Sequence, residues 1–169
     1  MAKKVLMVIA PDNFRDEEYF DTKEELEKAG IEITTVNSTG QPSKSAFGKI
    51  VKPDNNFYDV DVAGYDAIVF IGGGGTKVYF DNKRALELAK EFYNDHKVVS
   101  AICIAPEILV NAGIMNGKKA TSFPSIRNEI KAVATFTGTD VEIDGNIITA
   151  NGPKAAREFG KKIAGALKA

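Results

Sequence analysis

The chain has 169 residues, enough for one domain with a substantial core, and its hydrophobic fraction of 44% and charged fraction of 27% are those of an ordinary globular protein. Its formal net charge is −1, with acidic and basic residues interleaved, which gives no electrostatic reason to expect nucleic acid or an anionic membrane as a partner. The single cysteine cannot form an intramolecular disulfide, and no apolar run reaches the length of a signal core or a membrane span, so we expect a protein of the reducing cytoplasm.

The first part of the chain predicts two strands around a helix. Residues 5–10 form a continuous apolar run, typical of a strand that is covered on both faces of a parallel sheet. A helix of about four turns then follows and is expected to end at Gly30, a favourable residue just past a helix C-terminus. Residues 31–36 alternate and predict a second strand. The Gly-, Pro- and Asn-rich segment 37–62 predicts a long connection with one or two short strands, 49–52 among them.

The middle of the chain predicts two more buried strands. Residues 66–71 run directly into four consecutive glycines at 72–75, and a helix is expected from about 82 to 94. Residues 98–102 predict the next strand, which ends at Cys103. Each strand is thus followed by a turn and then a helix.

The last part of the chain begins with a helix that has Pro106 in its first turn, where a missing N–H costs nothing, and Gly113 at its end. Around Asp144-Gly145 we expect a hairpin with a type I′ turn. The other expected elements are a short strand, a short helix, the two hairpin strands and a final helix, at 119–122, 125–133, 141–143, 147–149 and from 153 onward.

Alternating strands and helices with short turns predict a single α/β domain over residues 1–169, built on a doubly wound, mostly parallel sheet with helices on both faces. In such sheets ligands bind at the carboxyl ends of the strands, near a switch in strand order. Three features meet that edge: the segment after Ala10, the glycine run after Ile71, and Cys103. Chemistry is therefore expected there.

Cys103 is the candidate nucleophile. The turn into the following helix is expected to expose its side chain and to point free N–H groups at it, so its pKa should fall below the roughly 8.5 of free cysteine. The oxygen of an adduct on sulfur would lie near the N–H of Ile104, and the turn at Gly72-Gly73 could supply a second donor. The alternative is a small buried hydrophobic residue without reactivity.

Two carboxyl groups follow the first strand on the predicted helix. Helical spacing places Glu18 on the inward flank and Glu17 on the side that faces water. A partly buried Glu18 would have a raised pKa and could donate a hydrogen bond to the Cys103 sulfur while protonated. The alternative is a solvated acidic first turn that complements the helix dipole.

Histidine, metal and nucleotide chemistry find little support in the sequence. The only histidine, His96, is expected at the opposite end of the Cys103 strand, roughly 20 Å away at ~3.3 Å per residue, which excludes a Cys–His dyad within one chain. One cysteine and one distant histidine provide no metal-ligand set. The glycine run lacks the context of a nucleotide-binding motif, and a tight turn with a donor function is the preferred interpretation. We expect neither a metal nor a cofactor.

Several segments together resemble the ThiJ/PfpI superfamily, which includes the PfpI intracellular peptidases and the parkinsonism-associated deglycase. The resemblance covers nearly the whole chain. The residues that carry it are Phe14 and Glu18; 65–69 and Gly72-Gly73; 101–103 and Pro106; Leu109, Ala112-Gly113 and 117–122; and 144–146, Thr149 and Gly152-Pro153.

The resemblance implies a flavodoxin-like fold with a nucleophile-elbow cysteine, usually as a homodimer or a hexamer built from dimers. It implies a nucleophile at Cys103, a protonated carboxyl partner at Glu18, and an oxyanion pocket formed by the N–H groups of Gly73 and Ile104. Members have been assigned peptidase, glyoxalase, deglycase, hydratase, chaperone and redox-sensor roles, and the fold does not choose among these.

Three positions depart from the family pattern: Ala105 replaces the usual glycine before Pro106, and two positions lack the usual histidine. PfpI-type peptidases carry histidine directly after the cysteine, where this chain has Ile104, and the deglycase branch takes a histidine from the segment where this chain has Phe123. We expect Phe123 and Gly72 to line the substrate pocket. A missing histidine shuttle, which contributes about 10²–10⁴-fold, penalises peptide hydrolysis most because an amine is a poor leaving group.

Three hypotheses follow, in order of preference. The first is an enzyme in which Cys103 adds to a small reactive carbonyl such as a 2-oxoaldehyde, with Glu18 as the sole acid and base. The second is a non-catalytic stress protein in which Cys103 senses oxidation as a sulfenic or sulfinic acid. The third is a cysteine peptidase, which would need His96 from a partner subunit.

Overall fold

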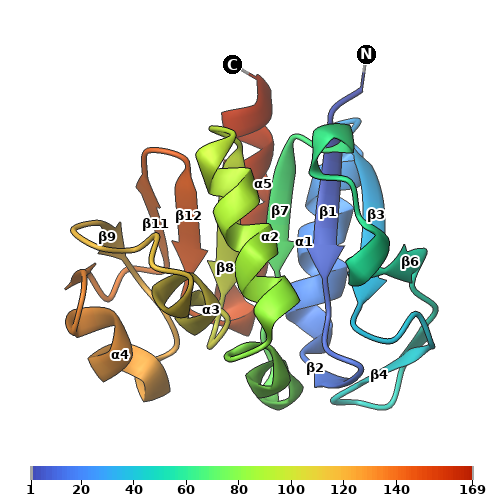
Figure 1. Ribbon diagram of the computed structural model, residues 1–169, viewed down its shortest axis with the longest axis horizontal. Coiled ribbons are helices and arrows are strands. Elements are labelled where there is room, and N and C mark those ends of the chain that lie inside the picture. The colour runs from blue at the N-terminus through green and yellow to red at the C-terminus, as the bar shows by residue number, and fades with distance from the viewer. Residues whose placement is uncertain (1, 169) are drawn as a thin grey trace.

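The computed structural model describes residues 2–168 and is built around one seven-stranded sheet with helices on both faces (Figure 1). The strand order is β11-β12-β8-β7-β1-β3-β6, and every neighbouring pair is parallel except β11 with β12. The strands are β1 Lys4–Val8, β3 Glu32–Asn37, β6 Asn55–Asn56, β7 Ala67–Phe70, β8 Val98–Ile102, β11 Val141–Asp144 and β12 Ile147–Ala150. The doubly wound, mostly parallel sheet predicted from the sequence is confirmed.

Five α-helices in the described part of the chain complete the layers. Helices α1 and α5 pack against each other on one face of the sheet, and α2 and α3 cover the other (Figure 1). Their bounds are α1 Asp16–Lys28, α2 Lys83–Asn94, α3 Pro106–Asn111, α4 Arg127–Lys131 and α5 Ala156–Lys168. None of the helices in residues 2–168 is both long enough and apolar enough to cross a membrane.

The strand order reverses between β1 and β7, because β3 and β6 lie on one side of β1 while β7, β8 and β12 follow on the other. This is the flavodoxin-like order, and its switch point is where ligands bind in open parallel sheets. In Figure 1 the parallel strands point downward, so this edge lies at the bottom of the view. The segments after β1, β7 and β8 meet there, as predicted.

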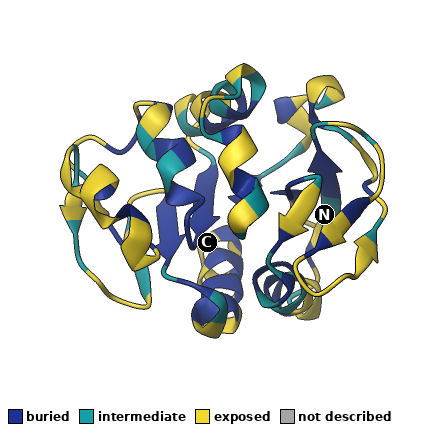
Figure 2. Ribbon diagram, turned by 90° about the horizontal axis from the view of Figure 1, so that it is seen from below, coloured by how far each residue is buried: buried dark blue, intermediate teal, exposed yellow. Residues whose placement is uncertain are grey.

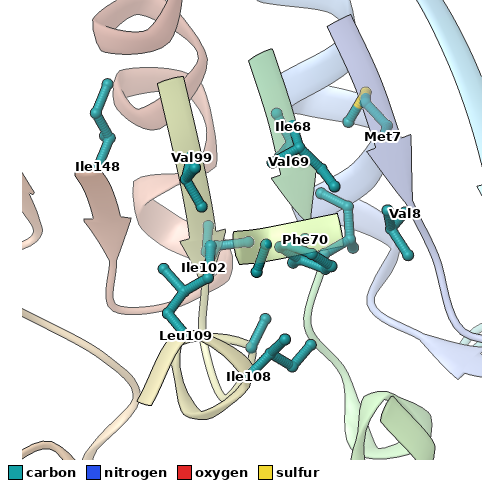
Figure 3. Packing of buried hydrophobic residues seen from close by; sticks show 14 of the residues in the cluster. Met7, Val8, Ile68, Val69, Phe70, Val99, Ile102, Ile108, Leu109 and Ile148 are labelled. Carbon is teal, nitrogen blue, oxygen red and sulfur yellow. The ribbon is translucent and has the colours of Figure 1, made fainter. Parts of the chain in front are cut away.

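The sheet is held by a continuous apolar core. Figure 2 shows buried strands enclosed by helices whose outer faces are exposed. At the carboxyl ends of β7 and β8, Phe70 and Ile102 lie next to Ile108 and Leu109 of α3, and all four are at most 1% exposed (Figure 3). Burial of such side chains contributes roughly 1.5–3 kcal/mol each. The end of β8 and the start of α3 are therefore firmly anchored on both sides of the turn that joins them.

The long connection after β3 contains the expected short strands. Strands β4 (Ser43–Ser45) and β5 (Ile50–Val51) form a small sheet with β2 (Asp12–Phe14), which follows β1. Asp16 ties this hairpin to the start of α1, because its carboxylate accepts hydrogen bonds from the Ser45 hydroxyl at 2.6 Å and the Phe47 N–H at 3.1 Å. A second small sheet pairs β9 (Lys119–Ala120) with β10 (Thr135–Phe136).

The β11–β12 turn corrects one prediction. Asp144 pairs with Ile147, so the two loop residues are Gly145 and Asn146. Gly145 has a φ of 59°, but Asn146 is not among the residues with positive φ. A type I′ turn requires positive φ at both positions, whereas a single glycine at the first position fits type II′. The Asn146 side chain instead donates a 3.0 Å hydrogen bond to the carbonyl of His96.

Candidate active site

Cys103 occupies a strained turn between β8 and α3. Its φ of 66° lies in the left-handed region, which is uncommon for a residue with a side chain and is favoured only where the surroundings over-determine it. Two hydrogen bonds do so here: the Cys103 N–H donates to the Ala150 carbonyl at 2.9 Å, and the Cys103 carbonyl accepts from the Phe123 N–H at 2.8 Å. This strand-to-helix elbow turns the thiol off the end of the sheet.

The thiol opens into a cavity of about 290 Å³, which we call the Cys103 cavity. Its lining residues are Asn13, Arg15, Glu18, Ala46, Gly73, Gly74, Lys77, Cys103, Ile104, Phe123, Ser125 and Pro153. Cys103 itself is only 9% exposed, so the expectation of an exposed side chain is wrong in degree. The sulfur nevertheless contributes to the cavity wall, which distinguishes it from a sealed core cysteine.

Glu18 lies on the inward side of α1, where helical spacing places it, and is completely buried. Neither of its carboxylate oxygens has a hydrogen-bond partner in good geometry within residues 2–168. A Cβ built on Gly72 would lie 2.5 Å from Glu18 Oε1 and 2.6 Å from the Cys103 Cβ. The carboxyl and the cysteine therefore flank Gly72 closely, and only glycine fits between them.

Burial dominates the protonation of both groups. It raises the pKa of Glu18 to about 7, while loose contacts with the Cys103 thiol and the Gly72 N–H lower that pKa by less. Burial, followed by the negative charge of Glu18, raises the pKa of the Cys103 thiol to about 12. The expected thiol pKa below that of free cysteine is therefore wrong. The N–H groups of Gly73 and Ile104 do act on the sulfur and lower its pKa, but desolvation and the nearby carboxylate outweigh them.

The glycine run brings the segment after β1 against the end of β7. Gly73 has a φ of 107°, and a Cβ there would lie 2.5 Å from the Arg15 N and 2.6 Å from the Asn13 O. The Arg15 N–H donates to the Gly72 carbonyl at 3.0 Å. These glycines thus permit close backbone approach, and the run continues into a 3-10 helix, Gly74–Tyr79, which the sequence reasoning missed.

The two positions that lack the family histidine both line the cavity with apolar groups. Ile104 is 7% exposed, and Phe123 is 42% exposed at the rim. His96 precedes β8 at the amino end of the strand, with an exposed side chain. Within residues 2–168, no group of three or more His, Cys, Asp or Glu side chains is arranged to hold a metal ion.

Arg15 and Lys77 are cavity residues that the sequence reasoning missed. Arg15 forms a bidentate pair with Glu17, with Nε–Oε1 at 3.1 Å and Nη2–Oε2 at 2.9 Å. This pairing raises the pKa of Arg15 and lowers the pKa of Glu17. Glu17 does face outward, but it is paired rather than freely solvated. Arg15 directly precedes the acidic first turn of α1, and this position in the sequence could have predicted its pairing with a carboxylate.

A larger hollow of about 530 Å³ adjoins the Cys103 cavity, and we call it the outer hollow. It is lined by Arg15, Glu17, Phe123, Pro124, Asp140, Asn151, Gly152, Pro153 and Lys154. Arg15, Phe123 and Pro153 belong to both linings, so the two spaces share a wall. A ligand longer than the Cys103 cavity could extend past Phe123 into the outer hollow.

One protein-family model matches almost the entire chain. A family model described as the DJ-1/PfpI family matches residues 3–166. An uncharacterized protein of Methanocaldococcus jannaschii is 44% identical over 98% of this chain and 82% of its own length. A Bacillus subtilis protein named provisionally as a cysteine protease, YraA, is 31% identical over 99% of this chain and all of its own length. A protein of Thermococcus kodakarensis named as a deglycase is 30% identical over 88% of this chain and 90% of its own.

Solved structures show the same fold. A ThiJ/PfpI domain protein from Brachyspira murdochii superposes with a TM-score of 0.96 at 31% identity and covers 99% of this chain and 97% of its own. Drosophila melanogaster DJ-1beta superposes with a TM-score of 0.93 at 29% identity and covers 99% of this chain and 91% of its own.

Proposed function

The chain belongs to the DJ-1/PfpI family, and from this premise we propose that it is a cysteine-dependent enzyme of small reactive carbonyl compounds, with glyoxalase- or deglycase-like chemistry. Cys103 is the nucleophile, and Glu18 is its acid and base. One observation carries the proposal: a fully buried carboxyl without a good hydrogen-bond partner lies beside the only thiol, at the wall of a cavity. Such a carboxyl costs stability, and groups of this kind concentrate at functional sites.

The first chemical step is addition of sulfur to the carbonyl carbon. The Glu18 carboxylate takes the thiol proton while the S–C bond forms and the carbonyl π bond breaks. The charge that develops on oxygen lies near the N–H groups of Gly73 and Ile104, which already act on the sulfur. Glu18 then returns the proton to this oxygen, and the product is a thiohemiacetal.

A 2-oxoaldehyde can be carried further without a cofactor. Glu18 removes the proton from the carbon bonded to sulfur and returns it to the neighbouring carbon, while the hydroxyl proton of the first carbon passes to the ketone oxygen. The first carbon is thereby oxidised to a thioester while the ketone is reduced to an alcohol, so electrons balance within the substrate. Water then cleaves the thioester and releases a 2-hydroxy acid and the free thiol. No amine leaving group has to be protonated, so the apolar residues at Ile104 and Phe123 hinder this chemistry less than peptide hydrolysis.

Turnover of methylglyoxal tests the proposal. We expect the purified protein to consume methylglyoxal and form lactate, and we expect Cys103→Ala to abolish this while the variant keeps its circular dichroism spectrum and thermal midpoint. Lys154→Met serves as a matched surface control, because Lys154 lines only the outer hollow. Undiminished turnover in Cys103→Ala, or no lactate from the unmodified protein, would refute the enzymatic role.

Oxidation sensing is the second candidate. It is favoured by the same Glu18 carboxyl together with the two N–H groups at the sulfur, because a sulfinic acid on Cys103 would give all three a partner. Under this alternative, mild peroxide adds two oxygens to Cys103 in intact-mass analysis, and Glu18→Leu prevents accumulation of that product. Peptide hydrolysis has less support, since the residues lining the Cys103 cavity include no histidine.

We further propose that the chain forms a homodimer or a hexamer built from dimers. Phe47 and Ile50, on the β4–β5 hairpin, are 67% and 64% exposed, and large apolar side chains at that exposure favour a protein contact. Light scattering should give at least twice the monomer mass, and Ile50→Glu should lower it. A monomeric unmodified protein would contradict this association.

A further inference from the structure

The Cys103 cavity has an unbalanced set of charges. Its lining contains two cationic side chains, Arg15 and Lys77, and a single carboxyl, Glu18. Glu18 is fully buried and burial raises its pKa to about 7, so near neutral pH it carries a negative charge in only about half of the molecules. The cationic side chains in the cavity lining therefore outnumber the carboxyl groups.

Lys77 is available to a ligand. It lies in the 3-10 helix that continues the glycine run, its side chain is exposed, and it forms no ion pair within residues 2–168. Burial raises the pKa of Glu107 on α3, and the charge of Lys77 offsets only part of this; the two groups are not in ion-pair contact. Among residues 2–168, no carboxylate thus neutralises the Lys77 ammonium by direct contact.

Arg15 is held in a fixed orientation with donors to spare. Its Nε and Nη2 bind Glu17, and its guanidinium lies 5.0 Å from the ring centroid of Phe47, while Nη1 donates to no group in the described chain. Glu17 lines the outer hollow but not the Cys103 cavity. The pair therefore presents its carboxylate to one space and its guanidinium to both. A pre-oriented guanidinium with free N–H groups is well suited to a carboxylate.

We propose that the substrate of the Cys103 cavity is a small carbonyl compound that carries a carboxylate, held by Lys77 and Arg15 while its carbonyl carbon faces the sulfur. This inference rests on the proposed function and narrows its substrate class. A cavity of about 290 Å³ lies at the lower end of the range for small-molecule sites, about 300–1,000 Å³, so the ligand has only a few carbon atoms. A neutral dicarbonyl would leave the Lys77 ammonium without an anionic partner and the Arg15 Nη1 without an acceptor.

The charge preference can be measured without turnover. Iodoacetate and iodoacetamide alkylate thiols and have nearly the same size, but only iodoacetate carries a carboxylate. We expect the ratio of their rate constants at Cys103, followed by intact-mass analysis, to exceed the ratio for N-acetylcysteine by about tenfold, as two nearby cations imply for a partly screened anion. The excess should shrink as ionic strength rises.

Substitutions test whether Lys77 causes the preference for iodoacetate. Lys77→Met should lower the iodoacetate-to-iodoacetamide ratio about threefold, and Lys77→Arg should retain it. Lys154→Met is the matched control, since it removes one positive charge from the outer hollow and should leave the ratio unchanged. A ratio equal to that of N-acetylcysteine, or one unaffected by Lys77→Met, would overturn the inference.

A ligand experiment separates this inference from the proposed function. Glyoxylate and glyoxal are small aldehydes of similar size, and only glyoxylate is an anion. Glyoxylate should protect Cys103 from iodoacetamide at a lower concentration than glyoxal does, through a reversible thiohemiacetal, and Lys77→Met should reduce the difference. Anion preference without methylglyoxal turnover would support the inference while the enzymatic proposal fails. Turnover with equal protection by both aldehydes would overturn the inference alone.

Discussion

Strand β8 begins just after one residue in the left-handed backbone conformation and ends just before another: His96 has a φ of 59° and Cys103 a φ of 66°. His96 is exposed, and its N–H donates to the Tyr93 carbonyl at 3.0 Å, as in an ordinary helix end. Cys103 is buried at the wall of a cavity beside an unpartnered carboxyl. The same backbone conformation therefore closes a helix at one end of the strand and presents a nucleophile at the other.

The difference lies in what surrounds each turn. At the amino end of the sheet, water reaches polar groups, so nearby side chains can change with little effect. At the carboxyl end, three segments crowd a small volume with no room for an added methyl group. Of the three non-glycine residues with positive φ in the described chain, Asn13, His96 and Cys103, only Cys103 is buried. Substitutions at matched positions on the two edges should therefore have very different effects, and four predictions use this contrast.

The largest effect is expected at the glycines on either side of β7. An added Cβ at Gly72 would lie within 2.7 Å of Glu18, Cys103 and the Ile102 carbonyl, whereas Gly64, at the amino end, has nothing within 4 Å. Gly72→Ala should lower the free energy of unfolding by about 3 kcal/mol and change the alkylation of Cys103, while Gly64→Ala should stay within about 0.5 kcal/mol of the parent. Urea denaturation measures both. Equal effects of the two substitutions would remove the contrast.

The next effect concerns stability and pH. Burial raises the pKa of Glu18 to about 7, above its ordinary value of 4.5, so the folded chain holds this proton more tightly than the unfolded chain. Its contribution is fully present below about pH 4.5 and is lost as pH rises through about 7, a change of about 3 kcal/mol in the free energy of unfolding.

Urea unfolding at pH 5 and pH 8 measures this change. Glu18→Gln should abolish the part of the change that comes from Glu18. Glu32→Gln, on the amino edge, is the control: the Glu32 side chain is 63% exposed. If Glu18→Gln leaves the difference between the two pH values intact, Glu18 does not hold its proton through burial.

A smaller effect is expected on the thiol itself. After burial, the negative charge of Glu18 is the main cause of the raised Cys103 pKa. Glu18→Gln keeps the side-chain volume and removes the charge, so it should move the pH profile of Cys103 alkylation down by about one pH unit. Between pH 8 and 10 Glu18 is ionised and the thiol is not, so iodoacetamide should alkylate the variant about tenfold faster at each pH. An upward shift would mean that Glu18 acts as a neutral hydrogen-bond donor to the thiolate.

The smallest effect is expected at the amino end of β8. His96→Gly removes the Cβ from a left-handed residue and should stabilise the fold by about 0.5 kcal/mol, after allowing for the greater freedom of glycine in the unfolded chain. Alkylation of Cys103 should not change. Slower alkylation in His96→Gly, at a protein concentration where the chain is oligomeric, would indicate that a partner subunit brings this histidine to the thiol.

The position of the site was predictable because it depends on patterns that are local in sequence. Apolar runs that end at Ile71 and Ile102 define parallel strands whose carboxyl ends share one edge, and helical spacing turns Glu18 inward. The thiol pKa was not predictable in this way. It depends on how completely distant segments exclude water from Cys103, and a segment such as the one around Phe123 reaches the sulfur only through tertiary packing.

Two other features could not be predicted from the sequence because they also depend on side-chain conformations and on contacts between distant segments. The Arg15–Glu17 pair depends on rotamers at the start of α1, and the negative φ of Asn146 depends on the carbonyl of His96, fifty positions away in sequence. Sequence patterns fix which residues follow which strand. The pKa values and conformations of the residues that meet at this edge depend on contacts between segments that are distant in sequence.

The packing of α1 against α5 gives the C-terminal helix a mechanical connection to the sulfur. A Cβ at Gly160 of α5 would lie 2.9 Å from the Glu25 Cβ and 3.0 Å from the Thr22 carbonyl, and Arg157 binds Glu25 at 2.8 Å. Because α1 also carries Glu18 near its start, a larger residue at Gly160 would displace α1 and with it the Glu18 carboxyl. Removing α5 would take away the surface against which α1 packs. We therefore expect a truncation that far from Cys103 to change the pKa of Glu18.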